Sequence, residues 1–359
     1  MKLIRRQVLR FYQQLQLNQA GSKKLIADTT APKLKVQRTG IYIFKVMLTV
    51  AFCFCFVTAF SVCLGSENSI IGVVTLLCIL VMRQVNFSID PKHSIAVLLI
   101  VFGIFAAGPR ISNMLPAGGA LIVNLVCIFT LVLTTCHNVI MSNHSTFVLC
   151  YLLLQGYDVS GHAYQMRLIG LLVGGIITIT VFYRNHHMCK FEADFSNLFS
   201  DFDITSARSQ WQIKFTLTVS ILMFILSVVG INRVMWAGIA AMSLMSPMAQ
   251  DMSNRLKYRA PYNVIGCALF LLLSLILPAN IFAYVGIIGG IGVGFSAKYN
   301  WQTVFNTFGA LYIAAGLYGI PAAIFLRIFH NAIASVFTVL SDKIFNTVTS
   351  NVLSTQYQE

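Results

Sequence analysis

Long apolar stretches alternate with short polar connectors along most of the chain between residues 41 and 340. The clearest unit covers residues 235–278 and reads MWAGIAAMSLMSPMA, then QDMSNRLKYRA, then PYNVIGCALFLLLSLILP. Both apolar parts are almost free of charge and close to the length of a membrane crossing. The pattern therefore predicts a hairpin of two membrane segments joined by a basic turn. A similar unit occurs earlier, in residues 69–108.

The same pattern repeats along the chain and predicts twelve helical membrane segments. Several are shorter than the ~20 residues that a full crossing needs, so we expect ten to twelve complete crossings. The expected fold class is all-α: a polytopic transmembrane helix bundle with two parallel-oriented repeats of about six spans each. The expected segments are 41–64, 69–82, 94–109, 117–135, 145–156, 166–183, 213–230, 234–249, 262–278, 281–297, 302–317 and 319–338.

Polar segments flank and divide these repeats. Residues 1–40 form a cytoplasmic N-terminal segment, which begins with an amphipathic helix at the membrane surface. An acidic amphipathic helix over 184–212 is expected to link the first repeat, 41–183, to the second repeat, 213–340. Residues 341–359 form a cytoplasmic tail. The apolar stripe of the N-terminal helix consists of Leu3, Ile4, Val8, Phe11, Tyr12 and Leu15.

Composition agrees with this architecture, since 57% of the residues are hydrophobic and only 10% are charged. Soluble domains carry about 25% charged residues. The net charge of +14 comes from basic residues before position 46 and in short connectors. That distribution is typical of cytoplasmic loops and not of a nucleic-acid surface. With twelve spans both termini are cytoplasmic, in a plasma (inner) membrane, and few basic residues fall elsewhere: Arg110, Arg167, Arg233 and Arg327.

The sequence offers little support for metal, cofactor or nucleotide chemistry. Its nine cysteines form no CxxC pair, so neither a metal site nor a disulfide framework is expected. The triplet at 201–203 matches a metal-binding DxD, but such short acidic matches are common. No Walker A motif occurs, and we expect no cofactor.

One part of the chain resembles a known family. The segment Met235-Trp236-Ala237-Gly238, with Ser246-Pro247, Arg255, Arg259 and Gly266 following, is similar to the fusaric-acid-resistance-like (FUSC) repeat of the aromatic acid exporters. The first half matches more loosely, and the resemblance covers roughly 41–340. It implies secondary, proton-driven efflux of small aromatic or amphiphilic organic acids. The chain lacks the extended cytoplasmic domain of larger family members.

Arginines beside the expected spans are the first candidates for binding such an anion. Arg83 follows one span, and Arg255 and Arg259 precede another, so an anion leaving the cytoplasm meets them first. A guanidinium matches a carboxylate with two hydrogen bonds. The alternative is that they anchor the helix ends at the interface. Asn124 is the most isolated polar residue of an apolar run, and it either lines the substrate route or joins two helices.

Candidates for proton coupling or gating lie in the same connectors. Asp90 and Asp251 are near the entry-side arginines and act either as proton carriers or as ion-pair partners. His144 adjoins a span and suits proton coupling, unless it is only a polar turn residue. Asp158 and His162 occupy an outer turn that serves either substrate release or simple solvation.

Three functions compete on this evidence. The first is the exporter, whose partners are a small organic anion and membrane lipids, with a homo-oligomer or an accessory export subunit left open. The second is a membrane scaffold without transport. The third is an intramembrane lipid-modifying enzyme, for which the eleven acidic residues are too dispersed. The exporter, which is not an enzyme, is the leading hypothesis.

Overall fold

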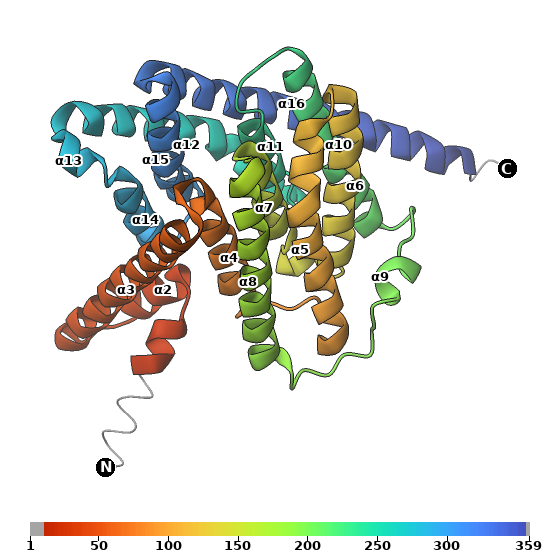
Figure 1. Ribbon diagram of the computed structural model, residues 1–359. Coiled ribbons are helices and arrows are strands. Elements are labelled where there is room, and N and C mark those ends of the chain that lie inside the picture. Colours follow the sequence, from red (N-terminus) through yellow and green to blue (C-terminus); the bar gives the residue numbers. More distant parts are fainter. Residues whose placement is uncertain (1–10, 357–359) are drawn as a thin grey trace. The chain divides into compact units, whose positions relative to one another are not determined.

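The computed structural model describes residues 11–356 of the chain, and within them every regular element is a helix. Side-chain surroundings are described for these residues up to 349, except Ala249. The membrane-protein architecture expected from the sequence is therefore confirmed as all-α (Figure 1). Its α-helices are α2 (Gln19–Ala27), α3 (Pro32–Leu64), α4 (Ser69–Met82), α5 (Pro91–Met114), α6 (Ala117–Thr135), α7 (His144–Gly156), α8 (Gly161–His186), α9 (Asn197–Ser200), α10 (Ala207–Val228), α11 (Met235–Leu244), α12 (Ala249–Ile276), α13 (Ala279–Phe282), α14 (Val285–Phe295), α15 (Tyr299–Tyr318) and α16 (Ile320–Gln356).

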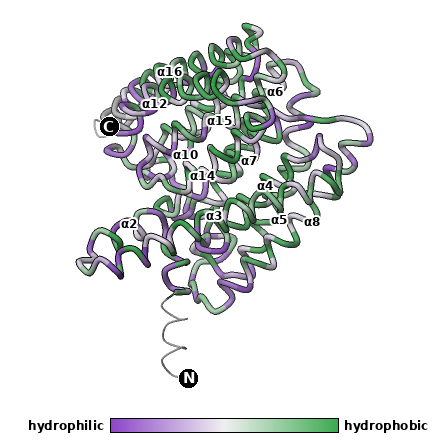
Figure 2. The backbone as a smooth tube through the Cα atoms, turned by 90° about the vertical axis from the view of Figure 1, so that its left-hand side faces the viewer, coloured by the Kyte–Doolittle hydropathy of each residue, from purple (hydrophilic) through white to green (hydrophobic). Residues whose placement is uncertain are grey.

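Seven of the described helices are long and apolar enough to cross a membrane: α3, α5, α6, α8, α10, α12 and α16. An 18-residue helical window rises about 27 Å, close to the ~30 Å of a hydrocarbon core. Each of the other five expected segments also contains a helix, of 10 to 20 residues: α4, α7, α11, α14 and α15. The expected ten to twelve crossings therefore stay a prediction. Figure 2 shows hydrophobic residues along the helices and hydrophilic residues gathered over α2 and the connectors.

The described residues divide into two compact units that do not follow the sequence halves. One unit combines Met1–Cys55 with Lys257–Ile328, and the other combines Phe56–Leu256 with Phe329–Glu359. We call them the small unit and the large unit. Each takes residues from both expected repeats, so the internal repeat and its boundaries stay predictions.

The large unit is a bundle in which α7 packs against α4, α5, α6 and α11. Helix α5 packs against α6, α7 and α8, while α10 packs along α6 and α4 along α8 (Figure 1). The interior consists of fully buried large side chains: Phe87, Phe105, Phe147, Tyr151, Phe182 and Phe215. A polar contact fastens α10 to the end of α6, since Gln212 Nε2 donates to the carbonyl oxygens of Val132 and Cys136, each at 3.4 Å.

In the small unit, glycines bring α14 and α15 into backbone contact. A Cβ on Gly289 would lie 2.7 Å from the Phe305 carbonyl oxygen, and one on Gly292 would overlap the Phe305 ring. Residues 287–294 form a glycine-rich run that lies entirely within α14. The structure shows close packing within one unbroken helix.

The prediction of a basic turn at 250–261 is wrong, because these residues belong to α12, which runs from Ala249 to Ile276. Arg, Leu, Lys and Ala in this stretch are strong helix formers, so it extends the following span. A true turn separates α15 from α16, where Gly319 adopts φ +79°. Only glycine takes this conformation readily, and it ends α15 at Tyr318.

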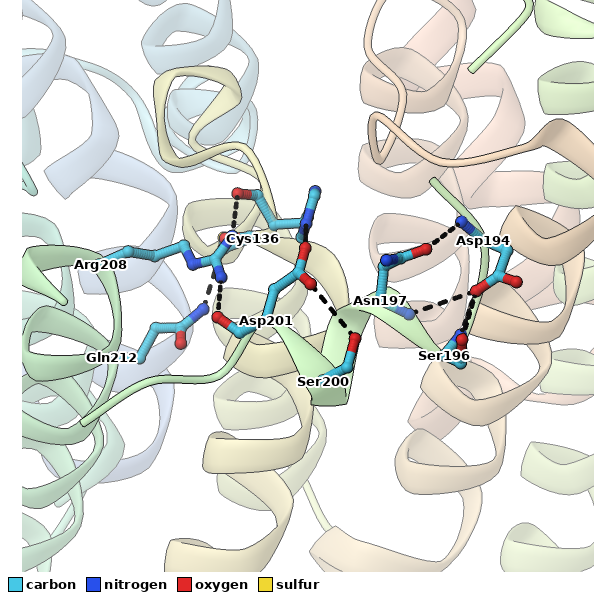
Figure 3. A network of polar contacts seen from close by, with 9 residues as sticks. Cys136, Asp194, Ser196, Asn197, Ser200, Asp201, Arg208 and Gln212 are labelled. Atoms are coloured by element: carbon cyan, nitrogen blue, oxygen red, sulfur yellow. Dashed lines mark hydrogen bonds and ion pairs between the residues drawn. The ribbon is translucent and has the colours of Figure 1, made fainter. Parts of the chain in front are cut away.

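The single linker helix expected over 184–212 is also wrong. Helix α8 ends at His186, α10 begins at Ala207, and only the four residues of α9 are helical between them. Asp194 Oδ1 accepts from the backbone N–H of Ser196 at 2.7 Å (Figure 3). Asp203 Oδ1 accepts from the backbone N–H of Thr205 at 2.9 Å. Such local side-chain bonds compete with helical hydrogen bonds and favour turns.

The terminal segments are described only in part. Leu3, Ile4 and Val8 of the expected N-terminal stripe lie outside the described residues. Residues 11–16 are helical, and Asn18 caps α2 by accepting from the Gly21 N–H at 2.7 Å. Helix α16 extends through the expected tail to Gln356, with Val336, Leu340 and Ile344 exposed.

Adding a methyl group to α14 should test the packing in the small unit. We expect Gly289→Ala to lower the apparent melting temperature in detergent, because the new Cβ meets a backbone oxygen that cannot turn away. Overpacking of this kind costs about 1–3 kcal/mol. Gly290→Ala is the matched control, since its Cβ would have nothing closer than 4.0 Å. Equal melting temperatures for the two variants would contradict the packing.

Candidate functional site

The large unit contains a cavity of about 170 Å³ that is buried around Asn124 and open toward the exposed residues Asn113, Leu115 and Ser227. The end of α5, the first half of α6, the end of α7, the second half of α10 and Val234, just before α11, form its walls. Its lining combines apolar side chains with uncharged polar ones. The polar lining residues are Ser112, Asn113, Asn124, Gln155 and Ser227.

Asn124 is the centre of a hydrogen-bond network in this cavity. Its side chain is only 4% exposed, and Oδ1 accepts from Tyr151 Oη at 2.7 Å and from Ser112 Oγ at 3.2 Å. Gln155 Nε2 in turn donates to Ser112 Oγ at 2.8 Å. The network joins three helices, so the helix–helix bond and the route-lining residue, which the sequence posed as alternatives, coexist at Asn124.

Helix geometry and one glycine explain how these side chains meet. Tyr151 and Gln155 are four residues apart on α7 and therefore share a face. Gly108 of α5 allows α6 and α7 to come close, because a Cβ there would lie 2.7 Å from Cys127 Sγ and 2.9 Å from the Tyr151 ring.

Two polar atoms of the network have unused hydrogen-bonding capacity. The Gln155 Oε1 atom is buried and has no hydrogen-bond partner among the described residues. Within the same part of the chain, the amide nitrogen of Asn124 donates no hydrogen bond. A buried polar atom without a partner costs about 1–3 kcal/mol. The cavity is therefore suited to a ligand that supplies both a donor and an acceptor.

Three arginines gather at the end of α7, next to the cavity. Arg110 pairs with Asp158 at 2.7 Å, Arg167 Nη2 donates to the Tyr157 carbonyl at 2.6 Å, and Arg233 Nη1 donates to the Gly156 carbonyl at 3.4 Å. The C-terminus of a helix carries a partial negative charge that favours cations. The three basic residues expected on the outer side thus form one cluster, and it includes Asp158 of the predicted outer turn.

His144 and Arg255 lie elsewhere in the large unit, where α7 begins. Arg255 Nη1 donates to the Ser243 carbonyl at 2.9 Å, and the His144 ring meets Trp211 edge to face at 4.7 Å. His144, the first residue of α7, lies outside the seven candidate spans. Burial lowers the pKa of its imidazole to about 3, and the positive charge of Arg255 acts in the same direction. His144 is therefore neutral at pH 7 in this conformation.

Arg259 belongs to the small unit, where it is 8% exposed and Nη1 donates to Tyr299 Oη at 2.8 Å. One turn further along α12, Asn263 Nδ2 donates to Thr307 Oγ1 at 3.1 Å. Arg327 of α16 is also buried, at 7% exposure.

The remaining candidates are exposed or cap helices. Arg83 is exposed at the end of α4, and Asp251 is exposed in the first turn of α12. Asp90 caps α5 by accepting from the Lys92 N–H at 2.8 Å. The ion pairs expected for Asp90 and Asp251 are absent from the described residues. Asp201 of the DxD triplet pairs with His137 at 3.1 Å, and no described His, Cys, Asp and Glu residues gather into a metal site.

Comparison with known proteins matches one part of the chain to a family model. Residues 220–341 match the family model described as fusaric acid resistance protein-like. This region is FUSC-like. The match begins within α10 and ends within α16, so it includes Arg255 and Arg259, while the Asn124 cavity is formed mostly by residues that precede it. No curated protein and no solved structure matches the chain.

The FUSC-like match and the apolar helices together identify an integral membrane protein. Of the cavity network, the sequence indicated only Asn124. Ser112 and Gln155 were missed because they stand near helix ends, where polar residues are ordinary, and Tyr151 was missed because an aromatic residue is ordinary within an apolar run. The spacing of Tyr151 and Gln155 by four residues was the one available signal.

The lowered pKa of His144 predicts a pH-dependent stability. In the unfolded chain the imidazole of His144 takes up a proton near pH 6.5, whereas in the folded chain it stays neutral down to about pH 3. The contribution of His144 to the free energy of unfolding is therefore complete above pH 6.5 and is lost as the pH falls toward 3. We expect the apparent melting temperature of the natural chain to fall more steeply between pH 7 and 5 than that of His144→Gln.

The exposed His187 provides the matched control, and His187→Gln should follow the natural chain. Parallel curves for the natural chain and His144→Gln would show that His144 takes up its proton while folded.

Proposed function

We propose that this protein is a secondary transporter that exports small aromatic or amphiphilic organic acids, driven by the proton gradient. The observation that carries the proposal is the uncharged polar cavity around Asn124, which lies between apolar helices of a membrane protein whose residues 220–341 are FUSC-like. Polar side chains inside a membrane bundle are costly and commonly mark a substrate pathway.

The size of the cavity suits a single aromatic ring. A cavity of about 150 Å³ in another protein accommodates benzene, and this cavity is about as large, at 170 Å³. Typical pockets for larger ligands have about 300–1,000 Å³. Apolar side chains such as Leu121, Met223 and Phe224 would contact the ring, while Asn124 and its network would contact the acid group.

We assign the entry of the substrate to the cytoplasmic arginines Arg83, Arg255 and Arg259, and gating to Asp90, Asp251 and His144. The charge distribution supports a plasma-membrane location with both termini in the cytoplasm. In this orientation the cluster of Arg110, Arg167 and Arg233 lies on the release side.

Transport by the purified protein in liposomes tests the proposal. We expect an imposed pH gradient to move single-ring aromatic carboxylates, and Asn124→Leu to lower the rate about tenfold, as expected for one lost hydrogen bond of about 1.4 kcal/mol. Asn185→Leu, which changes an exposed asparagine of α8, should transport normally. Size-exclusion chromatography checks that both variants fold. Flux no greater than in empty liposomes, across a broad panel of acids, would refute the exporter.

The entry-side arginines can be tested one at a time in the same liposomes. We expect Arg83→Gln, Arg255→Gln and Arg259→Gln each to raise the substrate concentration for half-maximal flux about tenfold, because a charge-assisted bond contributes about 1.5–3 kcal/mol. Arg184→Gln changes an exposed arginine at the end of α8 and is the control. Unchanged kinetics in the three variants would leave these arginines as interfacial anchors.

A further inference from the structure

The residues that line the Asn124 cavity include no charged side chain. A carboxylate placed at the buried end of the cavity, beside Asn124, would lose hydration without gaining an ion pair, and burying an unpaired charge is very costly. A neutral ligand avoids this cost. The absence of charge from the lining therefore selects against the ionised form of an organic acid, although that form dominates in neutral solution.

The unused hydrogen-bonding atoms of the network match the neutral form of the same acid. The Asn124 Oδ1 atom is already occupied by Tyr151 and Ser112, which leaves the amide nitrogen as the group available to a ligand. The buried Gln155 Oε1 atom needs a donor. A protonated carboxyl group has one carbonyl acceptor and one O–H donor, and thus satisfies both residues.

Charged groups near the cavity are engaged elsewhere. On α5 and in the turn after α7, Arg110 and Asp158 pair with each other, while Arg167 of α8 and Arg233 before α11 bind carbonyl oxygens near the end of α7. Helix α6 carries no charged residue. On α10 the charged residues, Arg208 and Lys214, precede the lining residue Met223 by at least nine positions, about 13 Å along the helix.

We infer that the Asn124 cavity binds an aromatic acid in its neutral, protonated form, with Asn124 donating to the carbonyl oxygen and Gln155 accepting from the hydroxyl. The inference rests on the proposed export function and specifies the form of the substrate. The acid takes up a proton from water before it binds and returns it to water after release, so each molecule of acid carries one proton. Proton coupling then requires no titrating side chain in the cavity.

Binding measurements on the full chain in detergent test this inference without any transport. The probes are benzoate, benzamide and methyl benzoate, titrated calorimetrically at pH 5.5 and 7.5. Benzamide cannot ionise and has both a donor and an acceptor, so it should bind equally at both pH values. The apparent affinity for benzoate should fall about a hundredfold over the two pH units, as its neutral fraction does. Methyl benzoate, which lacks the donor, should bind about tenfold more weakly than benzamide.

Variants locate the binding in the cavity. Gln155→Leu should weaken benzamide about tenfold, whereas Gln84→Leu, at an exposed glutamine in the same unit, should leave it unchanged. The melting temperature at each pH verifies that the protein is folded. Equal benzoate affinity at both pH values, or no binding of benzamide, would overturn the inference. Either result would favour a positively charged site that binds the ionised acid.

The two proposals fail separately. Flux in liposomes combined with pH-independent benzoate binding would refute the neutral-acid site and leave the exporter standing. Benzamide binding that depends on Gln155, without flux of any acid, would refute the exporter and leave a binding site for neutral aromatic compounds.

Discussion

A polar group in the hydrocarbon core has no water to bind, so it must find its partner within the protein, and this constraint governs the interior of the large unit. Asn124, Tyr151, Ser112 and Gln155 satisfy one another across three helices. Arg167 is 2% exposed and donates to the Asn68 side chain and to two carbonyl groups. Polar side chains there gather into networks, and the Asn124 network retains a spare donor and a spare acceptor beside a cavity.

The spare donor and spare acceptor of the Asn124 network connect the structure with the proposed transport. A site whose polar atoms are all satisfied by the protein has no hydrogen bond to offer a substrate, and a site containing a fixed charge holds an anion too tightly for easy release. The cavity avoids both extremes because its lining is uncharged and its network is incomplete. In the proposed mechanism the arginines at the cytoplasmic side collect the anion, and protonation of the acid opens access to the cavity.

The linker and the basic connector show where local and tertiary forces oppose each other. Between α8 and α10 the aromatic spacing favours a helix, but Asp194 and Asp203 bond to their own backbone and divide it into turns. Leu198 and Phe202 still find apolar contacts, since Leu198 is 2% exposed and Phe202 meets the Phe129 ring at 5.6 Å. In residues 250–261 the charges indicate a turn, yet helix propensity prevails and extends α12.

The sequence by itself determined the helical membrane architecture, because charge-poor segments of sufficient length have few other stable structures in water or lipid. It also determined the helix-forming segments and the FUSC-like resemblance, and it singled out Asn124 as an isolated amide in an apolar run. Only the tertiary structure decided which helices form each compact unit and which side chains reach Asn124. Gly108 permits the contact between Cys127 and Tyr151, and Gln155 joins the network from a helix end. Such long-range contacts depend on the packing of whole helices, which hydrophobic periodicity along one chain does not specify.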